Sequence, residues 1–280
     1  MTVVAIWYER EYDILWSVAD TRISKPGPTG GYVFSTNSGV KLFSLPISCR
    51  VIGLDPSIRQ APYFSTSFGF AFAGDVLPAV MTVATVTTIA QEFIASSAES
   101  RPSLWNIAEL VRKLSERFSK EVLASTNQRI GRFDAAVFGL CPIANAFEVY
   151  HLHPEGLNKN FCMRINHCEI SDSVPCVVLG SGKERLLEKL EEFRSSGEPF
   201  GRTVRLPMFA VDAIIREDHG DVGGSRSLGI ASRLGFSLYS SLVPFELGKP
   251  LAWRSFNGID LDTEIGMVGP CMVGMRGMTG

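Results

Sequence analysis

The chain has 280 residues, of which 45% are hydrophobic and 20% are charged, and its formal net charge is −2. This composition is typical of globular proteins, and the length allows one large domain or two small ones with a sizeable core. The small net charge gives no electrostatic reason to expect a nucleic acid or an anionic membrane as a partner.

The first part of the chain is predicted to form strands. Two apolar runs, residues 3–7 and 14–19, flank the charged stretch 9–13, which we interpret as a turn. The same charges interrupt the first apolar run, so no signal peptide is expected and the protein is expected in the cytoplasm. The segment KPGPTGG (25–31) predicts a loop. The stretches VFST (33–36) and VKLFSL (40–45) are expected to form a hairpin with each other.

The middle and the end of the chain alternate between helices and strands. SFGFAFAG (67–74) is typical of a buried strand that leads into a helix near Asp75. The apolar segment 76–98 contains Pro78 and many Thr and Ser residues, which favours a buried helix over a membrane span. Further expected elements are a helix capped by Ser103, strands over 133–141, 146–154 and 176–182, helices over 183–194 and 207–218, and strands over LGIAS and GFSLYSSL.

Runs of strands that alternate with pairs of helices predict an α+β fold. Two sheets that pack face to face, with a helix pair on each outer side, would bury the apolar strands on both faces. We expect one such domain over residues 1–231. Residues 232–280 are expected to be a C-terminal strand and extension that pack on the same domain.

Cysteine and histidine give no recognisable metal motif. The six cysteines form no CxxC pair, so we expect them to be reduced and partly buried. His151 and His153 alternate along a predicted strand, and His167 precedes Cys168, but no ligand quartet has a typical spacing. Neither a metal nor a cofactor is therefore expected.

Five short features occur in order along the chain: Thr2, ADTR (19–22), VKLF (40–43), FAFAG (70–74) and LGSG (179–182). This ordered set resembles the proteasome β-subunits and their bacterial ring-forming relatives, which are N-terminal nucleophile hydrolases. Each feature is common alone, and their order makes the set moderately specific. The resemblance covers about residues 2–231, with departures at 25–39, 46–66 and beyond 232. It implies a four-layer αββα sandwich.

The resemblance also implies a role for each matching residue. Thr2 would be the nucleophile once Met1 is removed, and its own amine would be the base. Lys41 would stabilise the alkoxide and keep that amine neutral, with Asp20 as its acidic partner. Gly74 would present a backbone N–H to the oxyanion. Ser181 would support the Thr2 amine.

Other matching positions are less definite. Asp218 is the nearest match to the family's second acid, but REDHGDVGG has one extra residue and places Asp221 or Val222 where a serine is usual. Ile23 and Ser24 would face a bound peptide, which would pair with them as an added strand. Arg22 is expected to be a structural partner of a carboxylate or a carbonyl.

Each residue also has a structural interpretation. Thr2 could be an ordinary strand residue, and Asp20 and Lys41 could form a surface ion pair. Gly74 could serve only a tight turn, and Ser181 could only cap the following helix.

The set predicts a threonine-type amide-bond hydrolase, a peptidase that cleaves peptides or unfolded proteins inside a ring or helical homo-oligomer. An ATPase could feed the chamber. A catalytically silent structural subunit and a small-molecule amidase of the same superfamily are the alternatives. Self-assembly has a second basis in the sequence, because the segment 76–91 contains no charge and one face of such a helix would need a neighbour, unless segment 46–66 or 232–280 covers it.

Overall fold

We describe a computed structural model of the chain, which covers residues 2–26, 32–52, 60–126, 131–156, 160–172, 174–196, 205–218, 220–244 and 252–278. The protein is a mixed α/β protein in which strand residues outnumber helix residues among those described. The chain divides into two compact units. Unit 1 is Met1–Leu42, Ser171–Ile230 and Leu238–Gly280, and unit 2 is Phe43–Ile170 and Ala231–Ser237.

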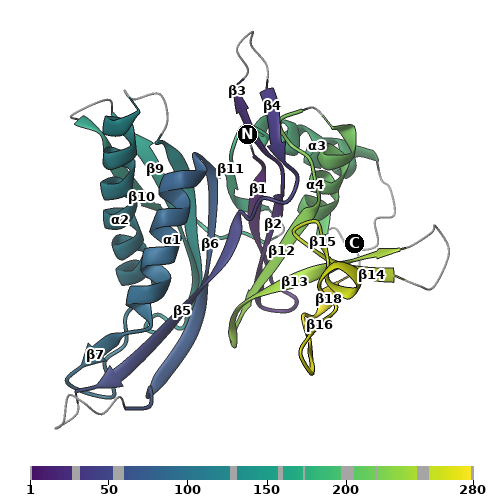
Figure 1. Ribbon diagram of the computed structural model, residues 1–280. Helices are drawn as coiled ribbons and strands as arrows, with labels where there is room; N and C mark the ends of the chain where they lie inside the picture. The colour runs from purple at the N-terminus through teal and green to yellow at the C-terminus, as the bar shows by residue number, and fades with distance from the viewer. Residues whose placement is uncertain are drawn as a thin grey trace. The chain divides into compact units, whose positions relative to one another are not determined.

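Unit 1 is built on a sheet with the strand order β11-β1-β2-β12-β13-β14-β15, in which β18 also pairs with β13 (Figure 1). These strands are β1 Val4–Glu9, β2 Ile14–Asp20, β11 Pro175–Leu179, β12 Arg226–Ser232, β13 Gly235–Pro244, β14 Ala252–Phe256, β15 Ile259–Asp260 and β18 Gly277–Met278. Two small antiparallel hairpins accompany the sheet: β3 Ile23–Pro26 with β4 Tyr32–Thr36, and β16 Met267–Val268 with β17 Cys271–Met272. A π-helical turn, Leu261–Ile265, follows β15.

The helix pair of unit 1 packs against this sheet. Helix α3 spans Lys183–Ser196 and buries Leu186 and Leu190. Helix α4 spans Leu206–Glu217, has a proline in its first turn, and ends at Asp218 in the left-handed conformation. Apolar side chains of both helices form one core with β1 and β2, in which Trp7 and Trp16 stack with ring centroids 5.9 Å apart.

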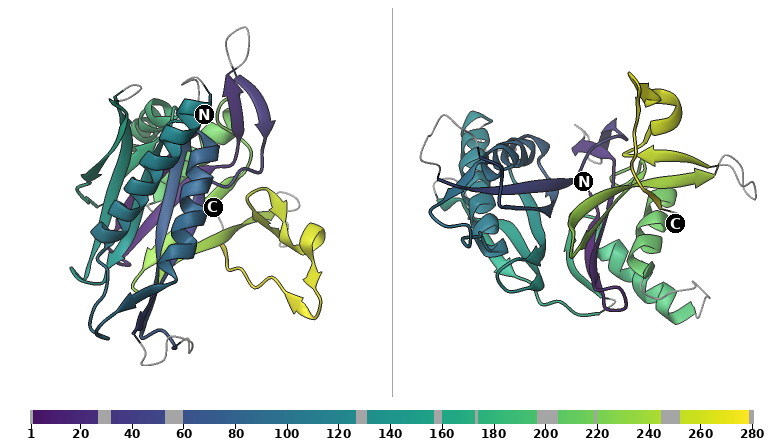
Figure 2. Two further views of the ribbon diagram at one scale, coloured as in Figure 1. Left: turned by 60° about the vertical axis from the view of Figure 1, so that its left-hand side comes forward. Right: turned by 90° about the horizontal axis from the view of Figure 1, so that it is seen from below.

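Unit 2 has its own sheet, with the order β10-β9-β8-β6-β5-β7. Its strands are β5 Leu42–Val51, β6 Phe64–Gly74, β7 Phe93–Ala95, β8 Phe133–Cys141, β9 Ala146–Glu155 and β10 Cys162–His167. Helices α1 Val76–Ala90 and α2 Leu104–Ser125 lie side by side on one face of this sheet (Figures 1 and 2). The core between them is apolar and includes five buried phenylalanines: Phe68, Phe70, Phe72, Phe133 and Phe161.

Local sequence explains where the helices of unit 2 begin. Asp75 caps α1, because its carboxylate accepts a hydrogen bond from the Leu77 N–H at 3.1 Å. Ser103 caps α2, as predicted, and forms a capping box in which the Asn106 Oδ1 accepts a hydrogen bond from the Ser103 N–H. The predicted strands over 133–141 and 146–154 are confirmed as β8 and β9.

Two predictions about local structure are wrong. The stretch VFST does not pair with VKLFSL, because β4 pairs with β3 and β5 belongs to the sheet of unit 2. Residues 27–31 of the loop predicted over 25–31 lie outside the described residues, and β3 and β4 form a hairpin that the sequence pattern did not reveal. The helix predicted over 76–98 ends at Ala90, where a short strand, β7, follows and pairs in parallel with β5.

The predicted extension after residue 231 is placed only in part. Ala231–Ser237 is grouped with unit 2, and Leu238–Gly280 with unit 1. The single domain over 1–231 and the four-layer arrangement stay predictions. In the described part of the chain, each unit has one large sheet and one helix pair.

Candidate active site

Strand register brings the N-terminus of the chain next to two other strand ends. Strand β1 is antiparallel to both of its neighbours, with Val4 opposite Ala19 of β2 and opposite Leu179 of β11. Because an antiparallel strand starts where its neighbours finish, the residue before β1 lies beside the residues that end β2 and follow β11. The sheet of unit 1 therefore brings together Thr2, Asp20 and Ser181.

Asp20 is the centre of this arrangement. Its side chain is fully buried, and Oδ1 accepts hydrogen bonds from Lys41 Nζ at 2.7 Å and from the Val3 N–H at 2.9 Å. Its Oδ2 accepts from the Gly223 N–H at 3.1 Å and from the Arg22 N–H at 3.2 Å. Four donors converge on one buried carboxylate, which is what a buried charge requires.

Lys41 is buried as well, with 2% of its side chain exposed. Burial lowers the pKa of the Lys41 ammonium, and the nearby charge of Arg22 lowers it further, while Asp20 and Asp221 act in the opposite direction. The interpretation of Asp20 and Lys41 as a surface ion pair is therefore wrong, because neither side chain is at the surface.

Thr2 is held by its backbone on both sides. Its carbonyl accepts from the Gly182 N–H at 3.1 Å, and the next amide, Val3 N–H, donates to Asp20. Gly180 has a φ of +88°, and a Cβ there would lie 2.1 Å from the Thr2 carbonyl oxygen. Only glycine allows the turn after β11 to approach Thr2 this closely.

Ser181 contacts a second carboxylate. Its hydroxyl donates to Asp221 Oδ2 at 3.3 Å, and the guanidinium of Arg185, in the first turn of α3, contacts the same oxygen. Burial raises the pKa of Asp221, but the hydrogen bonds and charge of Arg185 and the Ser181 hydroxyl outweigh it, so the pKa is lowered overall. Asp221 is thus a buried and ionised acid beside Ser181. No motif in the sequence indicated that Arg185 would contact Asp221.

Asp218, the predicted second acid, lies in a different environment. Its side chain is 65% exposed and forms an ion pair with the Arg22 guanidinium, whose Nε also donates to Asn37 Oδ1 at 2.9 Å. This agrees with the structural role predicted for Arg22. The contacts favour Asp221 over Asp218 as the second acid, and the extra residue noted in the sequence is the signal that could have found it.

The two predicted substrate-binding residues lie on β3. Ile23 pairs with Thr36 and Ser24 with Phe34 of β4. One edge of β3 is therefore occupied by β4, and an added peptide strand would use the other edge. Their contact with a substrate stays a prediction.

Gly74 lies in unit 2, at the end of β6. Its φ is +117°, and a Cβ there would lie 2.7 Å from the Arg132 carbonyl oxygen. The turn into α1 thus requires glycine because of its backbone conformation and the nearby carbonyl, whatever its role in catalysis. The oxyanion role of Gly74 stays a prediction.

Other kinds of site find little support in the described part of the chain. No group of three or more His, Cys, Asp or Glu side chains there could hold a metal ion. His151 and His153 lie near each other in unit 2, with ring centroids 5.3 Å apart. The six cysteines are free thiols, of which Cys49 and Cys141 are buried. No helix among the described residues is long and apolar enough to cross a membrane.

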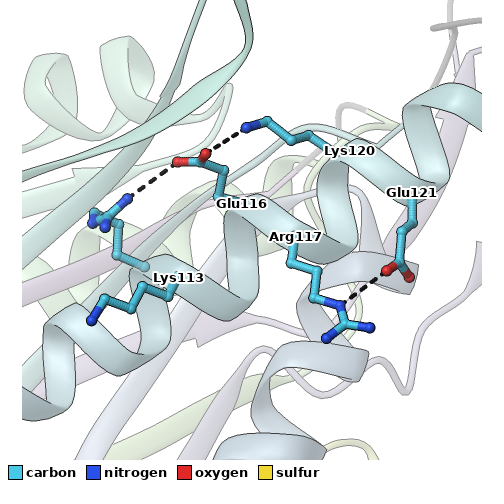
Figure 3. A pocket seen from close by; sticks show the side chains of 6 residues that line it. Lys113, Glu116, Arg117, Lys120 and Glu121 are labelled. Atoms are coloured by element: carbon cyan, nitrogen blue, oxygen red, sulfur yellow. Dashed lines mark hydrogen bonds and ion pairs between the residues drawn. The ribbon is translucent and has the colours of Figure 1, made fainter. Parts of the chain in front are cut away.

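A charged depression lies on the outer surface of α2 (Figure 3). All six residues that line it belong to this one helix: Arg112, Lys113, Glu116, Arg117, Lys120 and Glu121. Figure 3 shows Glu116 paired with Lys120 and Arg117 paired with Glu121. Glu116 also forms an ion pair with Arg112, with the two atoms 3.1 Å apart. Exposed pairs of this kind are ordinary helix surface, and we assign them no ligand.

Comparison with solved structures finds proteins with a similar fold, among them the following two. One is Anbu (ancestral beta-subunit) from Yersinia bercovieri, with a TM-score of 0.53 and 14% identity over 85% of this chain and 86% of that one. The other is the helical assembly of the Anbu complex from Pseudomonas aeruginosa, with a TM-score of 0.50 and 16% identity over 85% of each chain. No family model and no curated protein matches the sequence. The chain shares its fold with these Anbu proteins.

Proposed function

We propose that the chain is an N-terminal threonine hydrolase that cleaves peptide bonds. Thr2 becomes the N-terminus when Met1 is removed, and Lys41, Asp20, Ser181 and Asp221 support it. One observation carries the proposal. Asp20 of the buried Lys41–Asp20 pair also accepts a hydrogen bond from the N–H of Val3, the residue next to Thr2. A purely structural sheet end has no need of a buried lysine, because an apolar side chain would fill the space without the cost of desolvation.

The proposed reaction has two halves. The Thr2 hydroxyl oxygen attacks the carbonyl carbon of the peptide, and its proton passes to the α-amine of Thr2. The C–N bond then breaks, the leaving amine takes that proton, and an ester to Thr2 remains. Water attacks the ester with the same amine as base, which releases the acid and restores the hydroxyl.

Each supporting residue has a task in this scheme. The charge of Lys41 keeps the Thr2 amine neutral by repulsion and stabilises the forming alkoxide. Asp20 holds Lys41 and the Val3 amide in place. Ser181 and Asp221 supply a polar contact for the amine. Gly74 stays the predicted oxyanion donor within the predicted four-layer sandwich.

We propose further that the protein works in a self-assembled oligomer on peptides or unfolded proteins. The resemblance to ring-forming peptidases supports this, and so does the Anbu complex from Pseudomonas aeruginosa, which forms a helical assembly. Enclosure would keep a general peptidase away from the proteins of its own cell. An ATPase partner would be needed only for folded substrates.

The proposal is tested first by intact mass and then by substitution. Loss of one methionine mass from the purified protein is required, because an acylated Thr2 nitrogen cannot act as a base. Thr2→Ala should abolish hydrolysis of fluorogenic peptides, whereas the control Thr2→Ser should keep measurable activity, since it retains a hydroxyl. Retention of Met1 would favour the silent structural subunit. Hydrolysis of simple amides without hydrolysis of peptides would favour the small-molecule amidase.

A further inference from the structure

The C-terminal part of unit 1 presents an apolar hairpin to solvent. Strands β16 and β17 pair in register, and the exposed fractions of Met267, Val268 and Met272 are 61%, 65% and 74%. Cys271 is exposed as well. No charged side chain occurs between Gly266 and Met275. A soluble protein rarely leaves such a cluster uncovered unless a partner covers it.

This hairpin is held at its base. Arg254 donates from its N–H and its Nε to the Asp262 carboxylate, each at 2.9 Å, and from Nη1 to the Val273 carbonyl at 2.6 Å. The Ser240 N–H donates to the Arg276 carbonyl at 3.0 Å. The C-terminal segment, yellow in Figure 2, extends outward from β13 and β14 on these attachments. Much of the entropy of ordering the hairpin is therefore already lost before any partner binds.

A second uncovered apolar surface lies on α1 in unit 2. Leu77, Val80 and Ile89 are 54%, 41% and 40% exposed, and Ala84 and Thr88 are exposed between them. Their spacing of three to five residues places most of them on one face of the helix. Thr88 donates its hydroxyl to the Ala84 carbonyl at 3.1 Å, so its donor is already used by the helix itself. Val76–Ala90 contains no charged residue.

We propose that the β16–β17 hairpin of one copy docks on the exposed face of α1 of the next copy. The inference rests on the self-assembly proposed above and not on the hydrolase chemistry. The two surfaces are different parts of the chain, and contact between different surfaces propagates into rings or helices, whereas contact of one surface with itself closes a dimer. Both surfaces are apolar and uncharged, so their contact desolvates no charge.

The residue types suit an anchor contact. Methionine is flexible and polarisable, and it fits the irregular surface between the helix side chains. The hairpin is too small to form a whole interface, because standard interfaces bury about 800 Å² per partner. We expect it to act as a hot spot inside a larger contact, where a few apolar side chains account for most of the affinity.

Complementation between two variants tests the proposal. The hairpin variant is Val268→Asp with Met272→Asp, and the helix variant is Leu77→Asp with Val80→Asp. The matched control is Leu234→Asp, an apolar residue that is 94% exposed and belongs to neither surface. Each protein is studied at micromolar concentration by analytical ultracentrifugation, with a thermal melt to verify folding.

We expect the wild type and the control to form the same large assembly, and each double variant to sediment near the chain mass of 30.6 kDa. An equimolar mixture of the two double variants should form a one-to-one dimer, because it restores one intact pair of surfaces. Should the Asp variants fail to fold, Ser at the same positions replaces them, and we then expect at least a tenfold weaker assembly.

The outcomes separate this inference from the proposed function. A wild type that is monomeric overturns the proposed assembly and the docking together. A wild-type assembly that survives either double variant overturns the docking alone. Two monomeric variants that do not complement each other also overturn it, because the hairpin and the helix would then not be partners. Peptidase activity of the variants, measured separately, reports on the hydrolase proposal.

Discussion

The two units of the molecule differ in where they place charge. Among the described residues, unit 1 buries four charged side chains: Glu9, Asp20, Lys41 and Asp221. In the described part of unit 2, the buried polar side chains are the small hydroxyl residues Thr82, Ser115 and Ser119. The charges of α2 lie outside as pairs three or four residues apart.

This difference indicates that burial of charge in unit 1 has a cost in stability. A buried ion pair is often no more stable than apolar side chains of the same volume, because desolvation cancels the attraction between the charges. Unit 2 demonstrates that this chain can join a sheet and a helix pair through an apolar core. The charges buried around Asp20 in unit 1 are therefore better explained by chemistry than by stability.

One of the four buried charges is structural. Glu9 lies at the other end of β1 from Thr2 and accepts a hydrogen bond from the Trp16 indole at 2.5 Å. Trp16 also lies beneath the Arg205 guanidinium, which is 5.5 Å from its ring centroid. Glu9 is thus placed by its hydrogen bond to a core tryptophan, and buried charge marks a site only where several such groups meet.

The largest effect on stability is expected for Asp20→Asn. The substitution leaves Lys41 buried without a counter-charge and replaces one acceptor oxygen by an NH₂ group that faces donors. Removal of one partner of a buried pair typically costs about 3–5 kcal/mol. We expect a loss of this size in the free energy of unfolding by urea, together with loss of peptidase activity.

Asp134→Asn in unit 2 is the matched control, because its side chain is 40% exposed. It should change the free energy of unfolding by no more than about 0.5 kcal/mol. Equal losses for the two variants would remove the contrast between the units.

Lys41→Met should separate catalysis from stability. It should abolish activity about as completely as Thr2→Ala, since groups that act as a unit do not contribute additively. Its effect on the free energy of unfolding should be smaller than that of Asp20→Asn, because Asp20 keeps the N–H donors of Val3, Arg22 and Gly223. A variant that retains most of the activity would contradict the proposed role of Lys41.

The same variant has an expected pH dependence. The pKa of Lys41 is lowered in the folded protein, so between that value and the ordinary 10.5 the unfolded chain binds a proton that the folded chain has released. Wild-type stability relative to Lys41→Met should therefore rise with pH in this window. Below the folded pKa the burial cost is fully present. Urea unfolding of both proteins from about pH 7 to about pH 10 measures it, and a constant difference would contradict the lowered pKa.

The sequence singles out residues that the structure brings together, and their catalytic roles stay predictions. Thr2 and Asp20 could be expected to lie close to each other, because their motifs stand at strand ends and the antiparallel register of β1 and β2 brings these ends together. Lys41 lies just before β5 and contacts Asp20. Asp221 was harder to choose, since the left-handed residue Asp218 ends α4 and redirects the chain before it. Such a turn depends on local backbone geometry that periodicity does not reveal.

The sequence pattern also could not predict which strands pair with each other. The alternation in VFST and VKLFSL indicated two strands but could not show that they belong to different sheets. Which strands pair depends on contacts far apart in the sequence, such as that of β1 with β11. The sequence pattern therefore predicts more easily which helices accompany a sheet than the order of the strands within it.

The smallest effect is expected on the surface of unit 2. Glu121→Gln breaks the ion pair with Arg117, whose atoms are 3.0 Å apart and whose side chains are 52% and 69% exposed. Exposed pairs of this spacing contribute about 0.3–0.5 kcal/mol, because water screens the charges and both side chains must be ordered. We expect a loss within this range at low salt, a smaller loss at 1 M salt, and unchanged peptidase activity.

The control Arg117→Gln should have the same effect, and the double variant should cost less than the sum of the two. A loss above about 1 kcal/mol, or any loss of activity, would show that the charged surface of α2 contributes more than ordinary helix surface does, and the contrast between the two units would then have to be redrawn.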